Sequence, residues 1–430
     1  MYTIADIRKL VEEQHVRFLR LQFTDIFGRV KNIAVPITEL ERVLDNQVTV
    51  DGAVFTGVPG MQERVFLHPD YSTFILFPWR PRDGAVARLV CNGYTKTGER
   101  FSGCSRGVLE EVLEKAHPEY RLSIGVALDF FLFHVNERGK PVLVPQDYAG
   151  LCDLSPLDLG ENARRDLVNT LDEMGIDVVL SHHGEDPGKN RICLKTGALP
   201  AIADKIITTK FVIRAVAQRH GLYASFIPKP FKEYPGAGMS LLLILMEEGK
   251  NLFKSNGDAW GLSKVGYGFA AGLVKHAGGL TALSCPSVIS YKRLVSGKDP
   301  VLTGLSPNTR TAMLNTALVG NEPALEYWIP DAMSNPYLLL SAILSTGIRG
   351  VSEAADLPVI TKDGLPAEDS TGCRSLPKNL GAAIEALKAD AVLQSIMGDL
   401  IHGLYVQEKE KEWNEFLEEI HPWEIERYLP

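Results

Sequence analysis

His182 and His183 are the adjacent side chains in this sequence that look most like a metal site. Imidazole nitrogens are frequent ligands of transition metals. The run IDVVLSHH at 176–183 is strand-like, however, and successive residues of a strand point to opposite faces of their sheet. The two rings cannot readily bind one ion, so we expect structural roles for both.

Glycine-rich segments could bind phosphate groups. GYGFAAG at 266–272 is similar to a dinucleotide-binding fingerprint, but its last gap is one residue too long and it lies within an apolar helical pattern. We interpret its small residues as points of close helix packing. A nucleotide-binding P-loop needs Ser or Thr after Gly-Lys, and none of the Gly-Lys pairs has one; they stand at 139–140, 188–189, 249–250 and 297–298.

Cysteine thiols are a third source of chemistry. None stands in a CxxC spacing, and the sequence has neither HExxH nor a Gly-x-Ser-x-Gly motif. We expect reduced structural thiols in a cytoplasmic protein, with a catalytic cysteine as the alternative. The cysteines are Cys91, Cys104, Cys152, Cys193, Cys285 and Cys373.

The composition excludes several classes of protein. The chain has 430 residues, 45% of them hydrophobic, which is typical of a globular protein and not of a disordered or collagen-like one. Its net charge of −8 argues against nucleic acid and anionic lipid as partners. The longest purely apolar run, LLLIL at 241–245, is too short to span a membrane.

The elements that must position any site fall into two groups. Residues 16 to about 100 alternate apolar and polar side chains between Pro and Gly, which predicts a small mixed sheet beginning with a β-hairpin around Asp25–Gly28. From Gly103 onward, amphipathic helices alternate with strands, and YASFIPKP at 223–230 is one of the expected strands. NPYLLLSAILSTGIRGV at 335–351 is apolar on nearly all sides and predicts a buried helix. We therefore expect two domains, 1–102 and 103–430.

Ten segments, in order along nearly the whole chain, resemble glutamine synthetase of the bacterial type I class. They are FTDIFGRVKNIAVP at 23–36, VDGAVFTGVP at 50–59, FFLF at 130–133, RRDLVNTLDEMG at 164–175, SHHGEDPG at 181–188, FIPKPF at 226–231, GAGM at 236–239, YKRLVSG at 291–297, NPYLLL at 335–340 and HPWEIERYL at 421–429.

This resemblance implies an α+β fold, with an N-terminal β-grasp domain and a C-terminal catalytic-type domain of helices and a curled antiparallel sheet. It also implies a homo-oligomer of two stacked hexameric rings, a dodecamer with active sites shared between neighbours. The family's reaction, part of nitrogen metabolism, joins glutamate and ammonia with ATP and needs two divalent cations, Mg²⁺ or Mn²⁺. Oxygen ligands suit such hard cations.

The positions that match the family's metal ligands are mostly substituted. Two remain carboxylates, Glu326 unchanged and Asp129 shortened from Glu. The other four have lost their ligand groups and are Ala127, Gly184, Arg191 and Ser240.

Charge arithmetic indicates what these substitutions do. Asp129, Glu326 and Arg191 sum to −1, so two dications would be left uncompensated, at a cost on the order of several kcal/mol. We expect Arg191 to replace a metal ion and to pair with Asp129 or Glu326. The alternative is that Arg191 is a solvated strand-end residue and that Glu185 takes the ligand position.

The substrate-binding positions that match the family follow the same trend. Arg293 and Arg310 are retained, whereas five positions have changed and now read Pro235, Leu242, Asn315, Ala324 and Trp328. Asp51 matches the ammonium-site Asp and Asp299 replaces the flap Glu. Either carboxylate could be functional, or could equally be a solvated turn or cap residue.

Three hypotheses follow from the resemblance and its exceptions. The leading one is a pseudoenzyme, a glutamine synthetase-like binding, regulatory or structural oligomer with no cofactor, which could assemble with an authentic glutamine synthetase. The alternative is an ATP-dependent amide (carboxylate–amine) ligase with altered substrate, using ATP and Mg²⁺ or Mn²⁺. It rests on the retained Asp51, Arg293, Arg310 and Glu326. A small-molecule sensor with a Trp328 pocket is the third.

Overall fold

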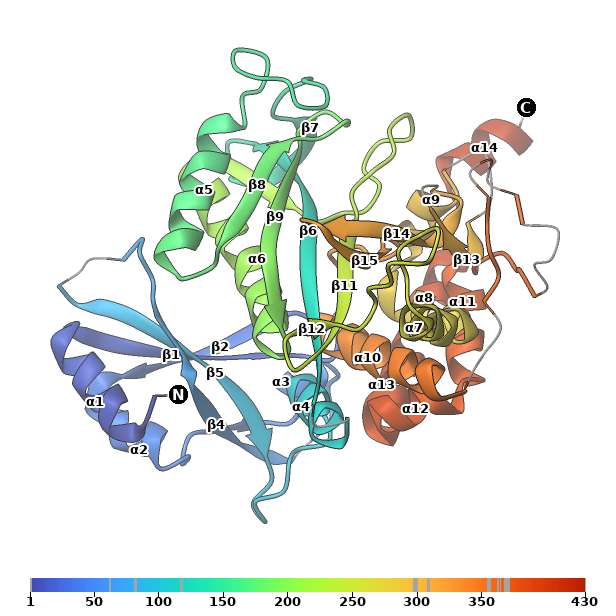
Figure 1. Cartoon of the computed structure of the whole chain (residues 1–430). Coiled ribbons are helices and arrows are strands. Elements are labelled where there is room, and N and C mark those ends of the chain that lie inside the picture. Colours follow the sequence, from blue (N-terminus) through green and yellow to red (C-terminus); the bar gives the residue numbers. More distant parts are fainter. Residues whose placement is uncertain are drawn as a thin grey trace.

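The computed structural model contains two β-sheets, each with its own hydrophobic core (Figure 1). It describes residues 2–61, 63–80, 83–116, 119–296, 301–307, 310–353, 357–361, 363, 365–366 and 372–429. The smaller sheet is formed by the N-terminal quarter of the chain, and the larger one by the remainder.

The N-terminal sheet has the strand order β2-β1-β5-β4-β3 and is mixed, because β1 pairs in parallel with β5 while its other pairs are antiparallel. The predicted hairpin is confirmed: β1 and β2 pair from Phe18↔Pro36 to Thr24↔Val30, and Gly28 turns the chain at φ +76°. The elements are α1 (Ile4–Glu13), β1 (Val16–Thr24), β2 (Val30–Pro36), η1 (Ile37–Glu39), α2 (Leu40–Leu44), β3 (Thr49–Asp51), α3 (Ala53–Thr56), β4 (Arg64–Leu76) and β5 (Ala85–Tyr94).

The larger sheet has ten strands, with the main order β13-β14-β15-β11-β6-β9-β8. The long strand β6 (Tyr120–Val135) runs through its centre and also pairs with β7 (Pro141–Pro145) and β10 (Leu222–Ser225) (Figure 1). All pairs are antiparallel except β13 with β14. The other strands are β8 (Val178–His183), β9 (Lys189–Ala198), β11 (Met239–Glu247), β12 (Lys250–Asn251), β13 (Leu302–Ser306), β14 (Ala312–Val319) and β15 (Glu322–Tyr327).

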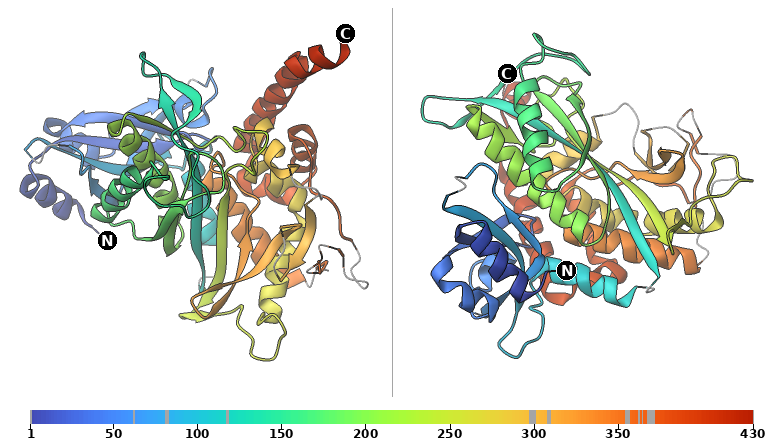
Figure 2. Two further views of the ribbon diagram at one scale, coloured as in Figure 1. Left: turned by 90° about the horizontal axis from the view of Figure 1, so that it is seen from above. Right: turned by 60° about the vertical axis from the view of Figure 1, so that its left-hand side comes forward.

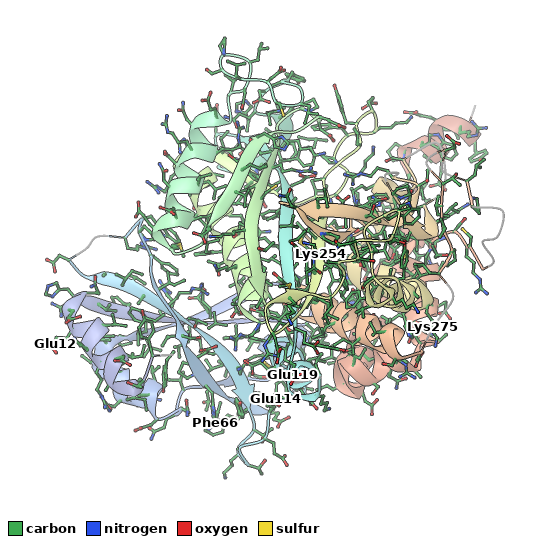
Figure 3. All side chains as sticks on the ribbon, in the orientation of Figure 1. Glu12, Phe66, Glu114, Glu119, Lys254 and Lys275 are labelled. Carbon is green, nitrogen blue, oxygen red and sulfur yellow. The ribbon has the colours of Figure 1, made fainter. Side chains whose placement is uncertain are left out.

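Helices pack against this sheet and share one hydrophobic core with it; Figure 3 shows the side chains that lie between the ribbons. They are α4 (Ser105–Lys115), α5 (Glu161–Glu173), α6 (Ala201–Arg219), α7 (Lys264–Lys275), α8 (Ala277–Ser284), α9 (Val288–Leu294), α10 (Pro336–Glu353), α11 (Leu380–Lys388), α12 (Ala391–Met397), α13 (Asp399–Glu418) and α14 (Pro422–Tyr428). As predicted from its apolar sequence, α10 is largely buried.

The glycines of GYGFAAG lie on α7, where they allow close contact with α10. A Cβ added to Gly272 would lie 2.1 Å from the Thr346 carbonyl oxygen, and one at Gly268 would lie 3.0 Å from the backbone of Val351. Such contacts leave no room for any side chain. The interpretation of this segment as a helix-packing surface is confirmed.

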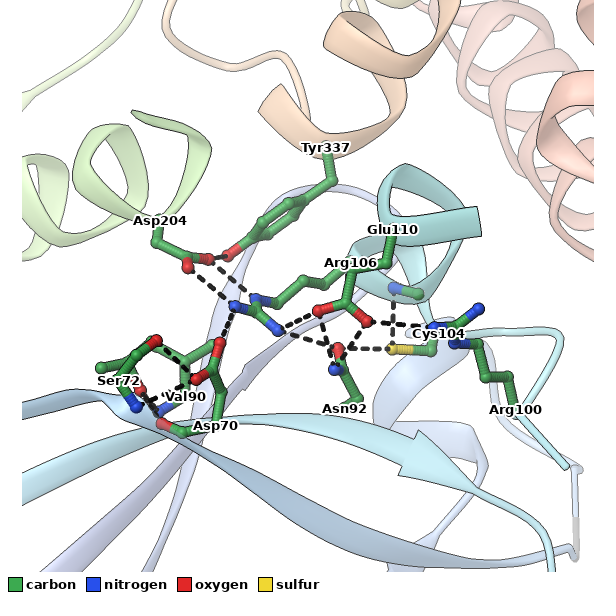
Figure 4. Close-up of polar contacts among 12 residues, drawn as sticks. Asp70, Ser72, Val90, Asn92, Arg100, Cys104, Arg106, Glu110, Asp204 and Tyr337 are labelled. Carbon is green, nitrogen blue, oxygen red and sulfur yellow. Dashed lines mark hydrogen bonds and ion pairs between the residues drawn. The ribbon is translucent and has the colours of Figure 1, made fainter. Parts of the chain in front are cut away.

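A buried network around Arg106 joins the two sheets (Figure 4). Arg106, on α4, donates to both carboxylate oxygens of Asp204 on α6, each at 3.0 Å, and to Asp70 on β4 at 2.6 Å. Tyr337 on α10 donates to Asp204 at 2.6 Å, and Glu110 accepts from Arg106 at 2.6 Å. This network fixes the N-terminal sheet against the helices of the larger one.

One predicted strand is shorter than expected, and the C-terminus projects from the body. The segment at 223–230 leaves the sheet after Ser225, because Pro228 and Pro230 have no N–H with which to continue the ladder. The first half of α13 packs into the body through Ile401 and Tyr405, whereas its C-terminal part and α14 extend away from the rest of the molecule (Figure 2). Within the described ranges, no helix is long and apolar enough to cross a membrane.

Candidate functional site

A cleft of about 410 Å³ lies over the strands β6, β9, β11 and β15 and contains most of the predicted site residues. Strand register brings them together. Asp129 on β6 lies opposite Arg191 on β9, and Ala127 on β6 lies opposite Ser240 on β11. Leu242 on β11 lies opposite Glu326 on β15. Residues distant in sequence thus meet on one patch of the central sheet.

Arg191 forms a two-point ion pair with Asp129. Its Nε donates to Oδ1 at 2.6 Å and its Nη2 to Oδ2 at 3.0 Å. Asp129 is 2% exposed and the Arg191 side chain 30% exposed. The expected pairing is therefore confirmed for Asp129, and Arg191 is not freely solvated. Glu185, the alternative ligand, is exposed on the rim of the cleft.

Lys189 is a second cation in this cleft and was missed by the sequence analysis. Its ammonium lies 3.6 Å from Asp129 Oδ2 and 3.3 Å from Asp186 Oδ1, and donates to the Gly236 carbonyl at 2.5 Å. The signal lay in PGKNRI, where Lys189 stands two residues before Arg191 on the same face of a strand. Only the register of β9 against β6 shows that both reach one carboxylate.

The packing around Lys189 explains the glycine at 184. A Cβ added to Gly184 would lie 2.6 Å from Lys189 Cγ and 2.7 Å from its Cδ. Lys189 thus fills the space that a longer side chain at position 184 would occupy. The absence of a carboxylate at position 184 and the presence of a cation at position 189 therefore belong to the same packing arrangement.

Glu326 is held by neutral and cationic donors of the protein. Ser240 Oγ donates to its Oε1 at 2.6 Å, and Asn315 Nδ2 to its Oε2 at 3.5 Å. Arg310, which is 63% exposed, lies 3.9 Å from Oε1. Two substituted positions, Ser240 and Asn315, therefore bind the one carboxylate that has not changed.

The protein's own cations favour an ionised Asp129. Burial opposes the ionisation of Asp129, but its hydrogen bonds with Arg191 and the charges of Arg191 and Lys189 outweigh burial and lower its pKa. The hydrogen bond to Asp129 raises the pKa of Arg191. Lys189 and Arg310 add two positive charges to the −1 of Asp129, Glu326 and Arg191, and Asp186 adds a negative one, so the formal charges of this group cancel. A neutral cluster with bonded carboxylates does not fit two divalent cations.

The residues at the positions that match the family's substrate-binding groups do not form an open anion-binding surface. Pro235 is exposed at the rim, next to Gly236, whose N–H donates to Asp186 at 2.7 Å. Trp328 donates from Nε1 to the Ala312 carbonyl at 2.7 Å, and the Arg310 guanidinium lies 5.2 Å from its ring centroid. Ala324 is fully buried, away from solvent.

Of the other predicted residues, Arg293 reaches the cleft and Asp51 does not line it. Arg293 Nη2 donates to the Ile329 carbonyl and contacts Cys285 Sγ at 3.7 Å, so one end of its guanidinium is engaged by the protein. Asp51 lies in the N-terminal sheet, where it is exposed and accepts from the Ala53 N–H at 2.8 Å. Asp299 lies outside the described residues.

His182 and His183 lie on different sides of β8, as predicted. His182 is on the wall of the cleft, whereas His183 is completely buried beside Asp147 and Asp158. Both nitrogens of His183 face acceptors: Nε2 is 2.8 Å from Asp147 Oδ1, and Nδ1 is 2.9 Å from the Gly184 carbonyl. Burial favours the neutral ring, but the hydrogen bond with Asp147 outweighs it and raises the pKa of His183. Both ring nitrogens of His183 thus have hydrogen-bond partners within the protein, which fits a structural role for this buried cluster.

The cysteines are free thiols. Cys91, Cys104 and Cys285 are buried, and burial raises the pKa of Cys285 to about 12. A thiol with a raised pKa is a poor nucleophile at neutral pH, which favours the structural interpretation.

Comparison with known proteins gives consistent matches over the whole chain. Residues 15–96 match the family model "Glutamine synthetase, beta-Grasp domain", and residues 102–428 match "Glutamine synthetase, catalytic domain". The predicted combination of a β-grasp and a catalytic-type domain is confirmed, while the boundary between residues 102 and 103 stays a prediction. Proteins named glutamine synthetase are 41% identical in Clostridium saccharobutylicum and 36% identical in Staphylococcus aureus; each match covers all of this chain, and 99% and 98% of the relative.

Solved structures are also similar to this chain over nearly its whole length. The structure titled "Apo GmaS without ligand" is 28% identical with a TM-score of 0.87, and each chain is covered to 99%. "GmaS/ADP complex-Conformation 1" is also 28% identical, with full coverage of both chains and a TM-score of 0.86. Plasmodium falciparum glutamine synthetase shares the fold, with a TM-score of 0.89 at 19% identity over 100% of this chain and 99% of that one.

Proposed function

Because the chain belongs to the glutamine synthetase family, we propose that it is a member whose cleft no longer assembles two divalent cations. In this proposal it is a binding, regulatory or structural oligomer instead of a glutamate–ammonia ligase. The observation that carries the proposal is the pairing of both remnant ligands by protein donors: Asp129 by Arg191 and Lys189, and Glu326 by Ser240 and Asn315.

The chemistry of phosphoryl transfer supports this proposal. In such reactions, divalent cations neutralise the phosphate oxygens as charge develops on them. Lys189 and Arg191 place fixed charges in the cleft, but both are committed to Asp129, and Lys189 also to Asp186. Binding a dication at Asp129 would require this ion pair to open and two cations to remain beside the metal, which Coulomb repulsion disfavours.

The C-terminal helices support the proposed oligomer. They expose a series of apolar side chains, with exposed fractions of 47–75%, in a segment that projects from the molecule (Figure 2). These are Leu417, Ile420, Trp423, Ile425, Tyr428 and Leu429. Large exposed apolar groups of this kind are typical of interfaces. We propose two stacked hexameric rings, in which a neighbour's Asp51 would approach the cleft.

The proposed loss of activity is tested with purified protein. The assay follows γ-glutamyl hydroxamate formation from glutamate, hydroxylamine and ATP, with Mg²⁺ or Mn²⁺. We expect no product. Product formation that is abolished by E326Q, a variant of the remnant ligand, would overturn the proposal. Product formation that E326Q leaves unchanged would come from a contaminating host enzyme. That enzyme is then removed by further purification and the test is repeated.

An ATP-dependent ligase with altered substrate is the second candidate, and the names of the relatives favour it over the non-synthetase proposal. Proteins named glutamine synthetase at 36–41% identity and a structural neighbour whose title names ADP support nucleotide binding. The exposed guanidinium of Arg310 is available for a phosphate in this case. Titration of ATP by calorimetry separates the two: Mg²⁺-dependent binding supports the ligase, and no heat at millimolar ATP supports the non-synthetase.

Two further expectations belong to this proposal. Assembly with an authentic glutamine synthetase would appear as mixed rings in native mass spectrometry after co-expression. A sensor role for Trp328 predicts that a ligand of the cleft changes its fluorescence, because Arg310 and the Ala312 carbonyl already fix the indole at the cleft wall.

A further inference from the structure

A cavity separate from the candidate cleft lies between the N-terminal sheet and the larger domain. Its volume is about 550 Å³, which falls in the range of small-molecule sites. One wall is formed by β1, β2 and the turn between them, and the opposite wall by α6 and α13. The two cavities have no lining residue in common among the described residues.

The lining of this interdomain cavity is strongly cationic. Among its described lining residues there are six arginines and lysines and no Asp or Glu. They are Arg20, Arg29, Arg80, Lys210, Arg214 and Lys409. Within the described part of the chain, only Lys409 of this set has an ion pair, with Glu412 at 2.7 Å. In a protein with a net charge of −8, such a concentration of unpaired positive charge is unusual.

Lys210 is the most informative of these cations because it is buried. It is 8% exposed, and its ammonium has no hydrogen bond or ion pair with any described residue. The Lys210 ammonium lies 5.8 Å from the centroid of the Phe226 ring. The Arg214 guanidinium lies over the same ring, 4.9 Å from its centroid. A buried ammonium without an anion is costly.

The charges facing Lys210 come from three elements. Arg214, one turn along α6, repels it, while Asp331 before α10 and Asp25 at the end of β1 attract it from outside the cavity lining. Burial, followed by Arg214, lowers the pKa of Lys210 to about 8. The two carboxylates therefore do not compensate for desolvation, and the ammonium lacks a counter-ion.

Aromatic rings form the other part of the lining. Phe77 and Trp79 are stacked, with centroids 4.8 Å apart and planes 13° apart, and Phe211 leans on both at 5.6 Å. Phe27, in the turn between β1 and β2, has Arg29 5.6 Å and Lys409 5.5 Å from its ring centroid. The cavity lining thus combines aromatic rings with positive charges.

We propose that the interdomain cavity binds a small organic anion that combines a flat ring with a phosphate or carboxylate group. The anion would lie against Lys210 and Arg214, since guanidinium and ammonium groups bind both acids through charge-assisted hydrogen bonds. The ring would lie against the aromatic walls. A nucleic acid is excluded as the ligand by the position of the cavity between the domains and by the net negative charge of the chain.

Such a ligand would connect the two domains. Arg20 and Arg29 belong to the N-terminal sheet, whereas Lys210 and Arg214 belong to α6 of the larger domain. An anion that contacts both sets binds the folded arrangement and not the unfolded chain, so it raises the unfolding temperature, and the rise continues with the logarithm of the ligand concentration above Kd. The site is independent of the chemistry in the cleft.

The test is a titration of the full-length protein, by calorimetry and thermal unfolding, with two probes: adenosine monophosphate as the phosphate and indole-3-carboxylate as the carboxylate. Adenosine and inorganic phosphate serve as the separate halves of the first probe, and indole as the ring of the second without its acid group. We expect at least one of the two probes to bind with micromolar to low-millimolar affinity and to bind more tightly than its fragments. Which probe binds identifies the acid group.

Three variants locate the binding. K210M and R214Q should each weaken binding at least about tenfold, as expected for one lost charge-assisted contact. R29Q, at an exposed position, should weaken it without any effect on folding. R165Q, at an exposed position outside both cavities, is the matched control and should leave affinity unchanged, while R310Q reports any binding in the candidate cleft. The proposal is overturned if neither probe binds, or if K210M and R214Q leave the affinity unchanged.

Discussion

Replacing Arg191 by Gln should destabilise the protein by about 2–4 kcal/mol. Arg191 supplies the two-point ion pair of a carboxylate that is 2% exposed. Removing one partner of a buried pair typically costs about 3–5 kcal/mol, because the remaining charge is left uncompensated. Lys189, 3.6 Å away, and the Gly238 N–H, at 3.2 Å, reduce that cost.

The pH dependence of this effect has a definite sign. The folded pKa of Asp129 is lowered, so the stability it contributes is present above the ordinary carboxyl pKa of about 4 and is lost as the pH falls through the folded value. The difference between wild type and R191Q should therefore be largest at neutral pH. It should shrink below about pH 4, where Asp129 of the variant is protonated.

Urea unfolding followed by tryptophan fluorescence measures the effect at pH 7 and at pH 4. R165Q is the matched control, because the Arg165 side chain is 67% exposed, and it should cost less than about 0.5 kcal/mol. The double variant D129N/R191Q should be more stable than R191Q alone, since no charge is left unpaired. A loss below about 1 kcal/mol in R191Q at pH 7 would refute the account of Arg191 as a buried counter-ion.

Three other perturbations test separate parts of the structure. G184A should cost about 1–3 kcal/mol in wild type and less in a K189A background, because its Cβ would lie 2.6 Å from Lys189 Cγ; equal costs in urea unfolding would contradict this packing. K210M should increase the free energy of unfolding by up to about 3 kcal/mol at pH 7. This gain should fall between pH 8 and pH 10.5, because the native Lys210, with its pKa of about 8, loses its proton at a lower pH than the lysine of the unfolded chain. A pH-independent gain would argue against a charged buried ammonium. R106Q should cost about 3–5 kcal/mol by leaving Asp204 and Asp70 without their cation, whereas R100Q, at the more exposed pair with Glu114, should cost less than about 1 kcal/mol. Similar losses in the two would show that the Arg106 network does not hold the domains together.

Local patterns in the sequence predict much of the fold because they report on local physics. The alternation around Asp25–Gly28 predicts the β1–β2 hairpin, and the apolar run at 335–351 predicts a buried helix; both are present. The strand predicted at 223–230 runs past the actual end of β10 at Ser225. The prediction follows the apolar residues of this segment and gives too little weight to the two prolines that stop the strand.

The candidate site could be predicted only where a single residue position carries the information. The substitution to Arg191 is visible in the sequence, and charge alone predicts its pairing with Asp129 or Glu326; the structure selects Asp129 through the register of β9 against β6. The role of Lys189 could not be predicted, because it depends on the register of β9 against β6 and on the space left by Gly184. The cationic interdomain cavity combines residues from seven separate segments between Arg20 and Lys409, so no local pattern could indicate it.

The central claim is that the cleft does not bind paired divalent cations, and the most direct measurement is Mn²⁺ binding followed by electron paramagnetic resonance. The purified protein is titrated with Mn²⁺ in the presence of ATP and glutamate. We predict no tightly bound Mn²⁺ at Asp129 and Glu326, so that the signal of free Mn²⁺ rises from the first addition as in a control with E326Q. Two Mn²⁺ ions bound per chain, and lost in E326Q, would contradict the account.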